Sequence, residues 1–311
     1  MQSISKPIKE NTKEGYDKII KDAFANNYYE SLEYINFLKK TIAINIRVKK
    51  FFNRSLFLIK NKMPSITLYD KKVAQELEKL NISYCMIDCI PNDINEDQSI
   101  LEYSLIPKKK YEIAKSQYKR SFRDALKQSK KHDIFIEIWE HPGEKKINKL
   151  YSLYKRQMHE LNSFVLPKSF FIAFLGCRAS KVFVVLKEEN KEIIAYCLCF
   201  ENSDNLYCSL GGSIRKFFKY KAVNILYDEL IRYGCSKGLN IHLGLGMKGS
   251  GYSRFKENAG AINYLCKVFP NNERILKIYQ KISHLKVVGI LLRLYSFLFP
   301  KKLIYLLIPM S

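Results

Sequence analysis

The most informative stretches of the chain are VFVVL (residues 182–186), IIAYCLCF (193–200), LYCSLGGS (206–213) and GLGMKGSGYSRFKENAG (244–260). The first three are rich in β-branched and aromatic residues, and short polar turns separate them, which predicts three antiparallel strands. Helical spacing over residues 222–235, ending at Gly238, is followed by a predicted strand at 240–245. A short helix near 252–258 and a last strand at 262–269 complete the predicted series of elements.

Further elements are predicted upstream of these strands. A basic helix is expected over residues 111–131, a strand over 134–139 and a helix over 146–161. The N-terminal part predicts a small α/β unit, with a helix at 28–40, strands at 42–48 and 55–59, a helix from Asp70 to Leu80 and a buried strand at 82–89. The polar stretch at 91–98 then indicates a boundary or a long loop.

The composition restricts the class of protein. With 311 residues, 47% of them hydrophobic, the chain can bury sizeable cores, which excludes a largely disordered protein. Its formal net charge of +23 favours contact with nucleotides, RNA or an anionic lipid surface. Lysine, asparagine and isoleucine are abundant throughout, as codon bias would produce, so part of this charge is discounted.

The eight cysteines lie mostly in apolar runs, without a CxxC pair or a histidine at ligand spacing. This arrangement argues against a metal centre or a disulfide framework, and buried free thiols in a reducing cytosol fit best. The N-terminus is polar, and no uninterrupted apolar run reaches the roughly 20 residues of a spanning helix. The sequence therefore predicts neither a signal peptide nor a transmembrane helix.

The predicted order of elements resembles the core of the GNAT fold, in which the sheet splays at its middle strands and an acyl donor lies in the opening. Residues 206–213, 222–238 and 244–260 also resemble the C-terminal half of FemAB-like proteins, where a GGS turn, a helix with a Gly-bounded strand and a Phe-Lys pair before a glycine recur in this order. Residues 119–127 resemble the basic helix of that family, and residues 150–171 resemble the segment before its central sheet. The match covers about half of the chain.

The resemblance implies an α/β protein built from two GNAT-like subdomains with mixed, mostly antiparallel sheets. We expect a degenerate N-terminal subdomain at residues 1–110, a FemAB-type acyltransferase domain at 111–270 and an apolar, helical C-terminal tail at 271–311. Within the tail, residues 285–309 are strongly apolar but interrupted by Arg293 and by Pro300-Lys301-Lys302. This pattern favours a segment that lies in the membrane interface, with packing on the protein as the alternative.

The glycine-rich turn at 244–251 is the main candidate for a site, because glycines allow its N–H groups to face a phosphate or a developing oxyanion. By resemblance, Lys256 is the active-site cation, and Tyr252 is a second catalytic candidate. The alternatives are a flexible turn, a solvated surface lysine and a packing tyrosine. The residues expected to contact substrate are Arg120, Arg123, Ser213, Arg215, Lys248, Gly249, Gly251, Arg254 and Phe255.

Acyl transfer to an amine requires a deprotonated nucleophile, an oriented carbonyl and a place for negative charge. The histidines stand apart from any nucleophile motif, and the nearest acids, Asp228 and Glu257, are not assigned as the general base. CoA-using relatives have a glycine-rich pyrophosphate turn where this chain has RKFFKYKA at 215–222, although the lysines there could neutralise phosphates at a helix N-terminus. Acyl-CoA and aminoacyl-tRNA both remain as donors, and neither a permanently bound cofactor nor a metal is expected.

These features favour a transferase that acylates an amino group of a lipid-linked or nucleotide-linked envelope precursor, in peptidoglycan or polysaccharide synthesis. We expect it in the cytoplasm, peripheral at the inner face of the plasma membrane. The alternatives are a CoA-dependent N-acetyltransferase of a soluble amine and a non-catalytic module that binds RNA or membrane. The basic helix at 111–131 could serve tRNA or a phosphate-bearing acceptor, or it could be a solvated cationic face.

Overall fold

The computed structural model describes the chain from residue 101 to residue 269, apart from residues 162 and 164. In the N-terminal part it describes residues 19, 21–25, 31, 33–34, 36–37, 46–51, 54–59, 66–68, 71–79 and 84–87. The tail predicted at 271–311 lies outside the described residues, as does most of the helix predicted at 28–40. The division into subdomains at residue 110 stays a prediction.

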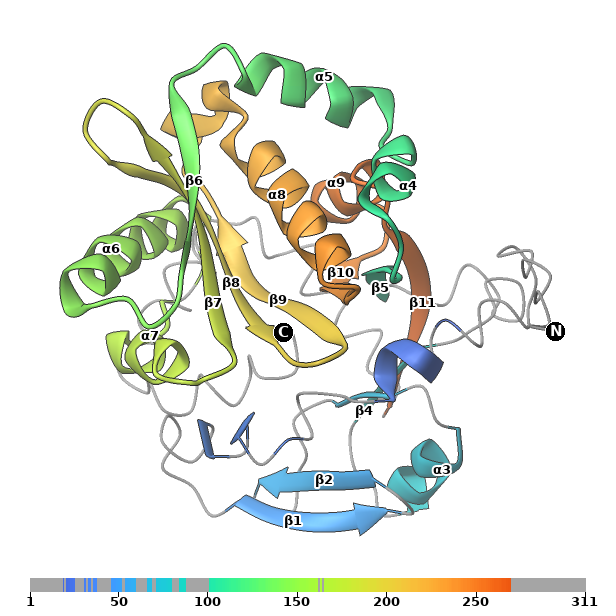
Figure 1. Ribbon diagram of the computed structural model, residues 1–311. Helices are drawn as coiled ribbons and strands as arrows, with labels where there is room; N and C mark the ends of the chain where they lie inside the picture. Colours follow the sequence, from blue (N-terminus) through green and yellow to red (C-terminus); the bar gives the residue numbers. More distant parts are fainter. Residues whose placement is uncertain are drawn as a thin grey trace, which may run out of the picture.

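Nine of the described strands form one sheet (Figure 1). Their order is β3 (Ile66–Leu68), β4 (Tyr84–Ile87), β11 (Ile262–Phe269), β5 (Leu101–Ile106), β10 (Asn240–Met247), β9 (Asn205–Gly212), β8 (Ile193–Glu201), β7 (Ser180–Lys187) and β6 (Ile134–Trp139). Neighbours are antiparallel except the pairs β3–β4 and β9–β10, which are parallel. The mixed, mostly antiparallel sheet of the α/β prediction is therefore confirmed. A separate hairpin consists of β1 (Ile46–Phe51) and β2 (Arg54–Ile59).

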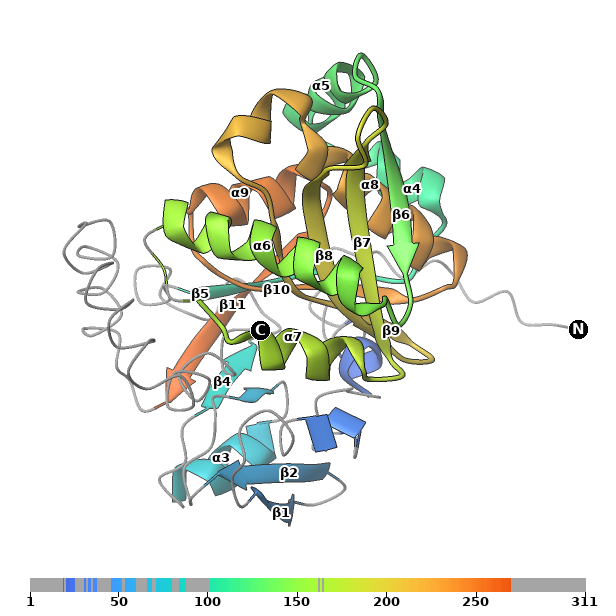
Figure 2. The same cartoon turned by 90° about the vertical axis from the view of Figure 1, so that its left-hand side faces the viewer.

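Helices cover both faces of the sheet around β7 and β8 (Figure 2). α8 (Ala222–Ser236) packs on one face, and α6 (Glu144–Glu160) and α7 (Lys168–Leu175) pack on the other. Residues 193–200 of β8 are all buried, which explains their continuous apolar run. On the α6 side, the hydroxyl of Tyr196 donates a hydrogen bond of 2.7 Å to Gln157.

Most elements predicted from periodicity are present, including α3 (Lys71–Lys79) and every strand from β6 onwards. The sequence did not predict β3, β5 or α7. β5 has the sequence LEYSLI, whose apolar–polar alternation is a strand signal, although it is short and follows the polar stretch at 91–98. α7 has the sequence KSFFIAFL, whose short apolar run carries no clear period.

The single basic helix predicted at 111–131 is wrong, because the chain forms α4 (Tyr111–Ser116) and α5 (Arg120–Ser129) instead. Between them Tyr118 is buried, and its hydroxyl donates to Asp228 of α8 at 2.9 Å. The N–H of Lys119 donates to the carbonyl of Asn258 at 2.9 Å rather than to a preceding helical turn. These tertiary bonds replace the helical bonds at the break and join α5 to α9 (Gly251–Asn258).

The parallel strands β9 and β10 separate part-way along their length. They pair only over Asn205–Tyr207 and Asn240–His242, after which β9 continues beside β8 and β10 beside β5. The register of β10 shifts between His242 and Gly244, and Gly244 has φ of +74°, a conformation that favours glycine. The sheet therefore opens between Cys208 and Gly244, as the predicted fold requires.

A buried histidine fixes the point at which the strands separate. The two ring nitrogens of His242 lie 2.8 Å from the hydroxyl of Tyr103 on β5 and 3.0 Å from the amide oxygen of Asn205 on β9. Its ring stacks on Tyr207 with the centroids 4.3 Å apart. Burial lowers the pKa of His242 to about 3, so the imidazole is neutral at physiological pH. His242 thus connects three strands next to the opening.

Candidate active site

Lys256 occupies the opening between β9 and β10. It extends from α9, and none of its surface is exposed. Its Nζ donates hydrogen bonds to the carbonyl oxygens of Gly244 at 2.8 Å and Leu245 at 3.1 Å. Gly246 lies against this amine, since a Cβ at that position would be in van der Waals contact with Nζ at 3.7 Å. The structure therefore excludes the alternative of a solvated surface lysine.

The environment of Lys256 changes its protonation. Burial lowers its pKa to about 7, because the ammonium loses its hydration, although Cys208, Glu102 and Cys266 oppose the shift. Both the ammonium and the neutral amine are consequently populated near neutral pH. Such a group can either stabilise a developing negative charge or exchange a proton.

Tyr252 lies between Lys256 and the surface. The Nζ of Lys256 lies 4.2 Å from the centroid of the Tyr252 ring, within the range of a cation–π contact. The two hydroxyls of Tyr252 and the buried Tyr227 of α8 lie 3.3 Å apart. Burial of the two hydroxyl groups raises the pKa of both phenols, so each stays protonated at physiological pH, although much of the Tyr252 ring is exposed. Tyr252 itself is 49% exposed, which places it at the boundary between the buried amine and solvent.

Glu102 is a carboxylate of this site that the sequence did not predict. It lies on β5, opposite Gly246 of β10, and is 8% exposed. Burial raises the pKa of Glu102, whereas a hydrogen bond from the backbone of Gly249 and the positive charges of Lys248 and Lys256 lower it. The register of β5 against β10 thus places a titratable acid beside the buried amine.

The turn between β10 and α9 holds these groups together. Gly249 has φ of +70°, and its N–H faces the carboxylate of Glu102 rather than the solvent. Ser250 caps α9 by accepting the N–H of Ser253 at 3.1 Å. Gly251 begins the helix, and Lys248 is exposed. Strand β10 therefore presents carbonyl oxygens to Lys256, and in the turn the N–H of Gly249 bonds to the protein's own carboxylate, Glu102.

Comparison with known proteins shows the fold. No family profile matches the chain, and no curated protein matches its sequence. Among solved structures, FemX superposes with a TM-score of 0.57 over 88% of this chain and 98% of FemX, at 11% identity. The chain has the FemX fold. L-PGS from Bacillus licheniformis superposes with a TM-score of 0.51 over 81% of this chain and 95% of L-PGS, at 10% identity.

The FemX fold confirms the FemAB-like fold of the GNAT type that the sequence predicted. Two of the predicted site residues, Ser213 and Phe255, make contacts that support this fold, and their roles in substrate binding stay predictions. The hydroxyl of Ser213 donates to the carbonyl of Ile194 at 2.5 Å, which ties the end of β9 to β8. The ring of Phe255 packs against Tyr227 and Phe122, with centroids 4.9 Å and 5.8 Å apart.

The four arginines predicted to bind substrate lie on the surface of the protein. The side chain of Arg120 is 92% exposed and lies 3.7 Å from Asp124 on the same helix. The guanidinium of Arg123 donates to the carbonyl of Tyr118 at the break between α4 and α5. Arg215 is exposed, although its backbone N–H donates to Glu160 at 2.8 Å, and Arg254 is exposed on α9. Their roles in substrate binding stay predictions.

The lysines expected to bind phosphate follow β9 in a 3₁₀ helix, η2 (Arg215–Tyr220). Lys216 forms an ion pair of 3.0 Å with Glu192 and lies over the ring of Phe217. Lys219 is exposed, and Lys221 adopts φ of +52° at the start of α8. β9 forms one side of the opening, and these lysines follow its C-terminal end.

The two acids nearest the motif in sequence have other partners. Asp228 accepts hydrogen bonds from the hydroxyls of Tyr111 at 2.7 Å and Tyr118 at 2.9 Å. Glu257 forms an ion pair with Lys119 at the surface. These three contacts join α8 and α9 to the segment that contains α4 and the start of α5. Glu102, which lies far from the motif in sequence, is the acid that the fold places beside Lys256.

Proposed function

We propose that the chain is an acyl or aminoacyl transferase that acylates an amino group of a cell-envelope precursor, in peptidoglycan or polysaccharide synthesis. The observation that carries this proposal is the buried Lys256 at the opening of a FemX-like sheet, beside the carboxylate of Glu102. The resemblance of the surrounding segments to FemAB-like proteins supports the reaction class.

The groups in the opening suit this reaction. The acceptor amine attacks the carbonyl carbon of the donor, a C–N bond forms, and negative charge develops on the carbonyl oxygen. As an ammonium, Lys256 has three N–H donors, of which two bond to Gly244 and Leu245. The third lies beneath the half-exposed ring of Tyr252, so it can stabilise that charge once Tyr252 turns away from the amine. The carboxylate of Glu102 accepts the proton of the amine. The bond to the leaving group then breaks, and the proton held by Glu102 passes to the leaving atom, which releases the thiol of CoA or the ribose hydroxyl of tRNA.

The donor in this proposal is an acyl-CoA thioester or an aminoacyl-tRNA. Both carry phosphates, which the lysines of η2 and the N-terminus of α8 can bind. A ligand that binds only the folded protein raises its melting temperature. We expect either CoA or charged tRNA to do so, and the one that does identifies the donor class. If neither changes the melting temperature, both donor assignments fail.

The proposed acceptor is lipid-linked or nucleotide-linked, and the protein would meet it at the inner face of the plasma membrane. None of the helices in the described part of the chain has the length and apolar character needed to cross a bilayer. The apolar segment at 285–309, whose sequence suits the membrane interface, lies outside the described residues.

The test compares envelope precursors by mass spectrometry in cells with and without the protein. Complementation with Lys256→Met should fail, and the variant's turnover should fall by about a hundredfold or more, because it loses a donor to the developing charge. Lys149→Met, which changes an exposed lysine of α6, is the matched control and should restore the modified precursor. Equal activity of the two variants would contradict the proposed role of Lys256, and identical precursor profiles with and without the protein would exclude the function.

A further inference from the structure

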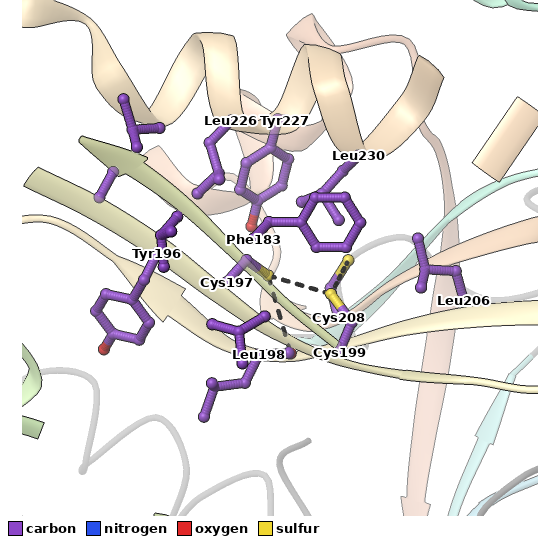
Figure 3. Close-up of a cluster of buried hydrophobic side chains, with 14 of the residues drawn as sticks. Phe183, Tyr196, Cys197, Leu198, Cys199, Leu206, Cys208, Leu226, Tyr227 and Leu230 are labelled. Atoms are coloured by element: carbon purple, nitrogen blue, oxygen red, sulfur yellow. Dashed lines mark hydrogen bonds between the residues drawn. The ribbon is translucent and has the colours of Figure 1, made fainter. Parts of the chain in front are cut away.

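Three cysteine side chains meet between the sheet and α8 (Figure 3). Cys197 and Cys199 are two residues apart on β8 and so point to the same face, and Cys208 is the partner of Cys199 on β9. The sulfur of Cys199 lies 3.7 Å from that of Cys197 and 3.9 Å from that of Cys208. All three sulfur atoms lie within 4.8 Å of one another.

These separations match those of a metal ion with three sulfur ligands. Metal–thiolate bonds are about 2.3 Å long, so a planar three-coordinate ion holds its sulfur atoms about 4.0 Å apart. Within the described residues, the cluster of neighbouring ligand atoms consists of these three sulfur atoms, with no carboxylate or imidazole as a fourth. Structural zinc is almost always four-coordinate, whereas thiolate ligands also select Cu(I).

We propose that Cys197, Cys199 and Cys208 together bind one Cu(I) ion. On binding, copper–sulfur bonds replace S–H bonds, the displaced protons leave to solvent, and copper keeps its charge of +1. Buried apolar side chains surround the sulfur atoms, among them Phe183 of β7 and Leu226 and Leu230 of α8 (Figure 3). This lining excludes water, which competes poorly with thiolates for a soft ion.

The opening between β9 and β10 supplies both a route and a compensating charge. Cys208 borders the opening and keeps 8% of its surface exposed, whereas Cys199 has none. Lys256 lies in the same opening, where its Nζ bonds to the carbonyl of Gly244 opposite Cys208, and its ammonium offsets one of the two net negative charges of Cu(I) bound by three thiolates. The sulfur atoms take no part in the proposed acyl transfer, so either proposal can fail alone.

The test uses the full chain, reduced and free of oxygen, with Cu(I) as the probe. After incubation with a competing Cu(I) chelator, we expect one retained ion per chain, with three sulfur ligands by X-ray absorption. Cys199→Ala and Cys208→Ala should each weaken retention by more than about a hundredfold, because even changes outside the ligand set cost about 10–100-fold. Cys235→Ala, which removes a partly exposed thiol of α8, is the control and should retain the ion.

Circular dichroism and melting temperatures without metal establish that each variant is folded. Cu(I) should then raise the melting temperature of the wild type and of Cys235→Ala, but not that of Cys199→Ala. Failure of the wild-type protein to retain Cu(I) would overturn the proposal. So would equal retention by the folded Cys199→Ala variant, or tighter binding of Zn(II) than of Cu(I). Thiols that pack only as small apolar groups would give the first of these results.

Discussion

Lys256 is a buried amine whose two hydrogen-bond partners are neutral carbonyl groups. Removing an ammonium from water costs free energy, and carbonyl dipoles replace only part of its hydration. A methionine would fit the same space without that cost. The lysine therefore lowers the stability of the fold, as catalytic groups in preorganised sites commonly do.

The lowered pKa of Lys256 predicts how stability changes with pH. Between pH 7, near its folded pKa, and pH 10.5, its ordinary value, the unfolded chain binds the proton more strongly, so this lysine makes stability rise with pH. The slope reaches about 1.4 kcal/mol per pH unit. Urea unfolding of the wild type and Lys256→Met at several pH values measures it. The variant should lose this part of the slope, and parallel pH profiles would show that Lys256 is not desolvated.

Glu102→Gln tests the proposed general base. The amide keeps the shape of the side chain but cannot accept a proton, so turnover should fall by about 10²–10⁴-fold, and the acidic limb of the pH–rate profile should disappear. Glu257→Gln, which removes an exposed partner of Lys119, is the matched control and should leave turnover nearly unchanged. If the acidic limb were unchanged in Glu102→Gln, a group other than Glu102 would be the general base.

Of the two charged residues in the opening, the sequence predicted Lys256 but not Glu102. Lys256 was found because it follows Phe255 in a recognisable local motif. Glu102 lies in LEYSLI, which has no motif, and its proximity to Lys256 depends on the pairing of β5 with β10. The meeting of three cysteines depends in the same way on the register of β8 against β9.

The break between α4 and α5 shows how tertiary contacts override helical periodicity. Tyr111 and Tyr118 both donate their hydroxyls to Asp228, and the burial of Tyr118 is incompatible with a continuous basic helix. One carboxylate of α8 thereby fixes the direction of α5, which packs against α9. Periodicity predicted the helical residues, but it contained no information about this shared acceptor.

Asp228→Ala should therefore destabilise the protein by about 2–3 kcal/mol, because it leaves the buried hydroxyl of Tyr118 without its acceptor. Asp124→Ala removes an exposed carboxylate of α5 that has only weak surface ion pairs, and it should cost about 0.5 kcal/mol or less. Urea denaturation of both variants gives the comparison. Equal stabilities would mean that Asp228 does not hold the break in place.

The strands from β6 onwards could be predicted because they combine apolar alternation with short polar turns. β5 alternates as well, with Leu101, Tyr103 and Leu105 on one face, but it is short and follows a polar stretch, so its place in the centre of the sheet depends on its distant neighbours. The failure to predict β5 matters for the site, because β5 carries Glu102 and pairs with β10 where β10 separates from β9.

At the scale of the whole molecule, the net charge of +23 and the apolar sequence at 285–309 predict attachment to an anionic lipid surface. The full chain should float with anionic liposomes in a density gradient and should do so less with neutral ones. A variant that ends at Ser283 should remain in the soluble fraction while keeping its circular dichroism spectrum. If the shortened variant floats as well as the full chain, the segment is not the anchor.

The place of β5 in the sheet also bears on how the chain reaches its native state. β5 is synthesised early, yet both of its neighbours, β10 and β11, come from the end of the described chain. During translation both edges of this strand stay unpaired until the ribosome has synthesised nearly the whole domain. Pairings so distant in sequence slow folding and expose nascent chains to aggregation, so chaperone dependence during synthesis follows from the topology.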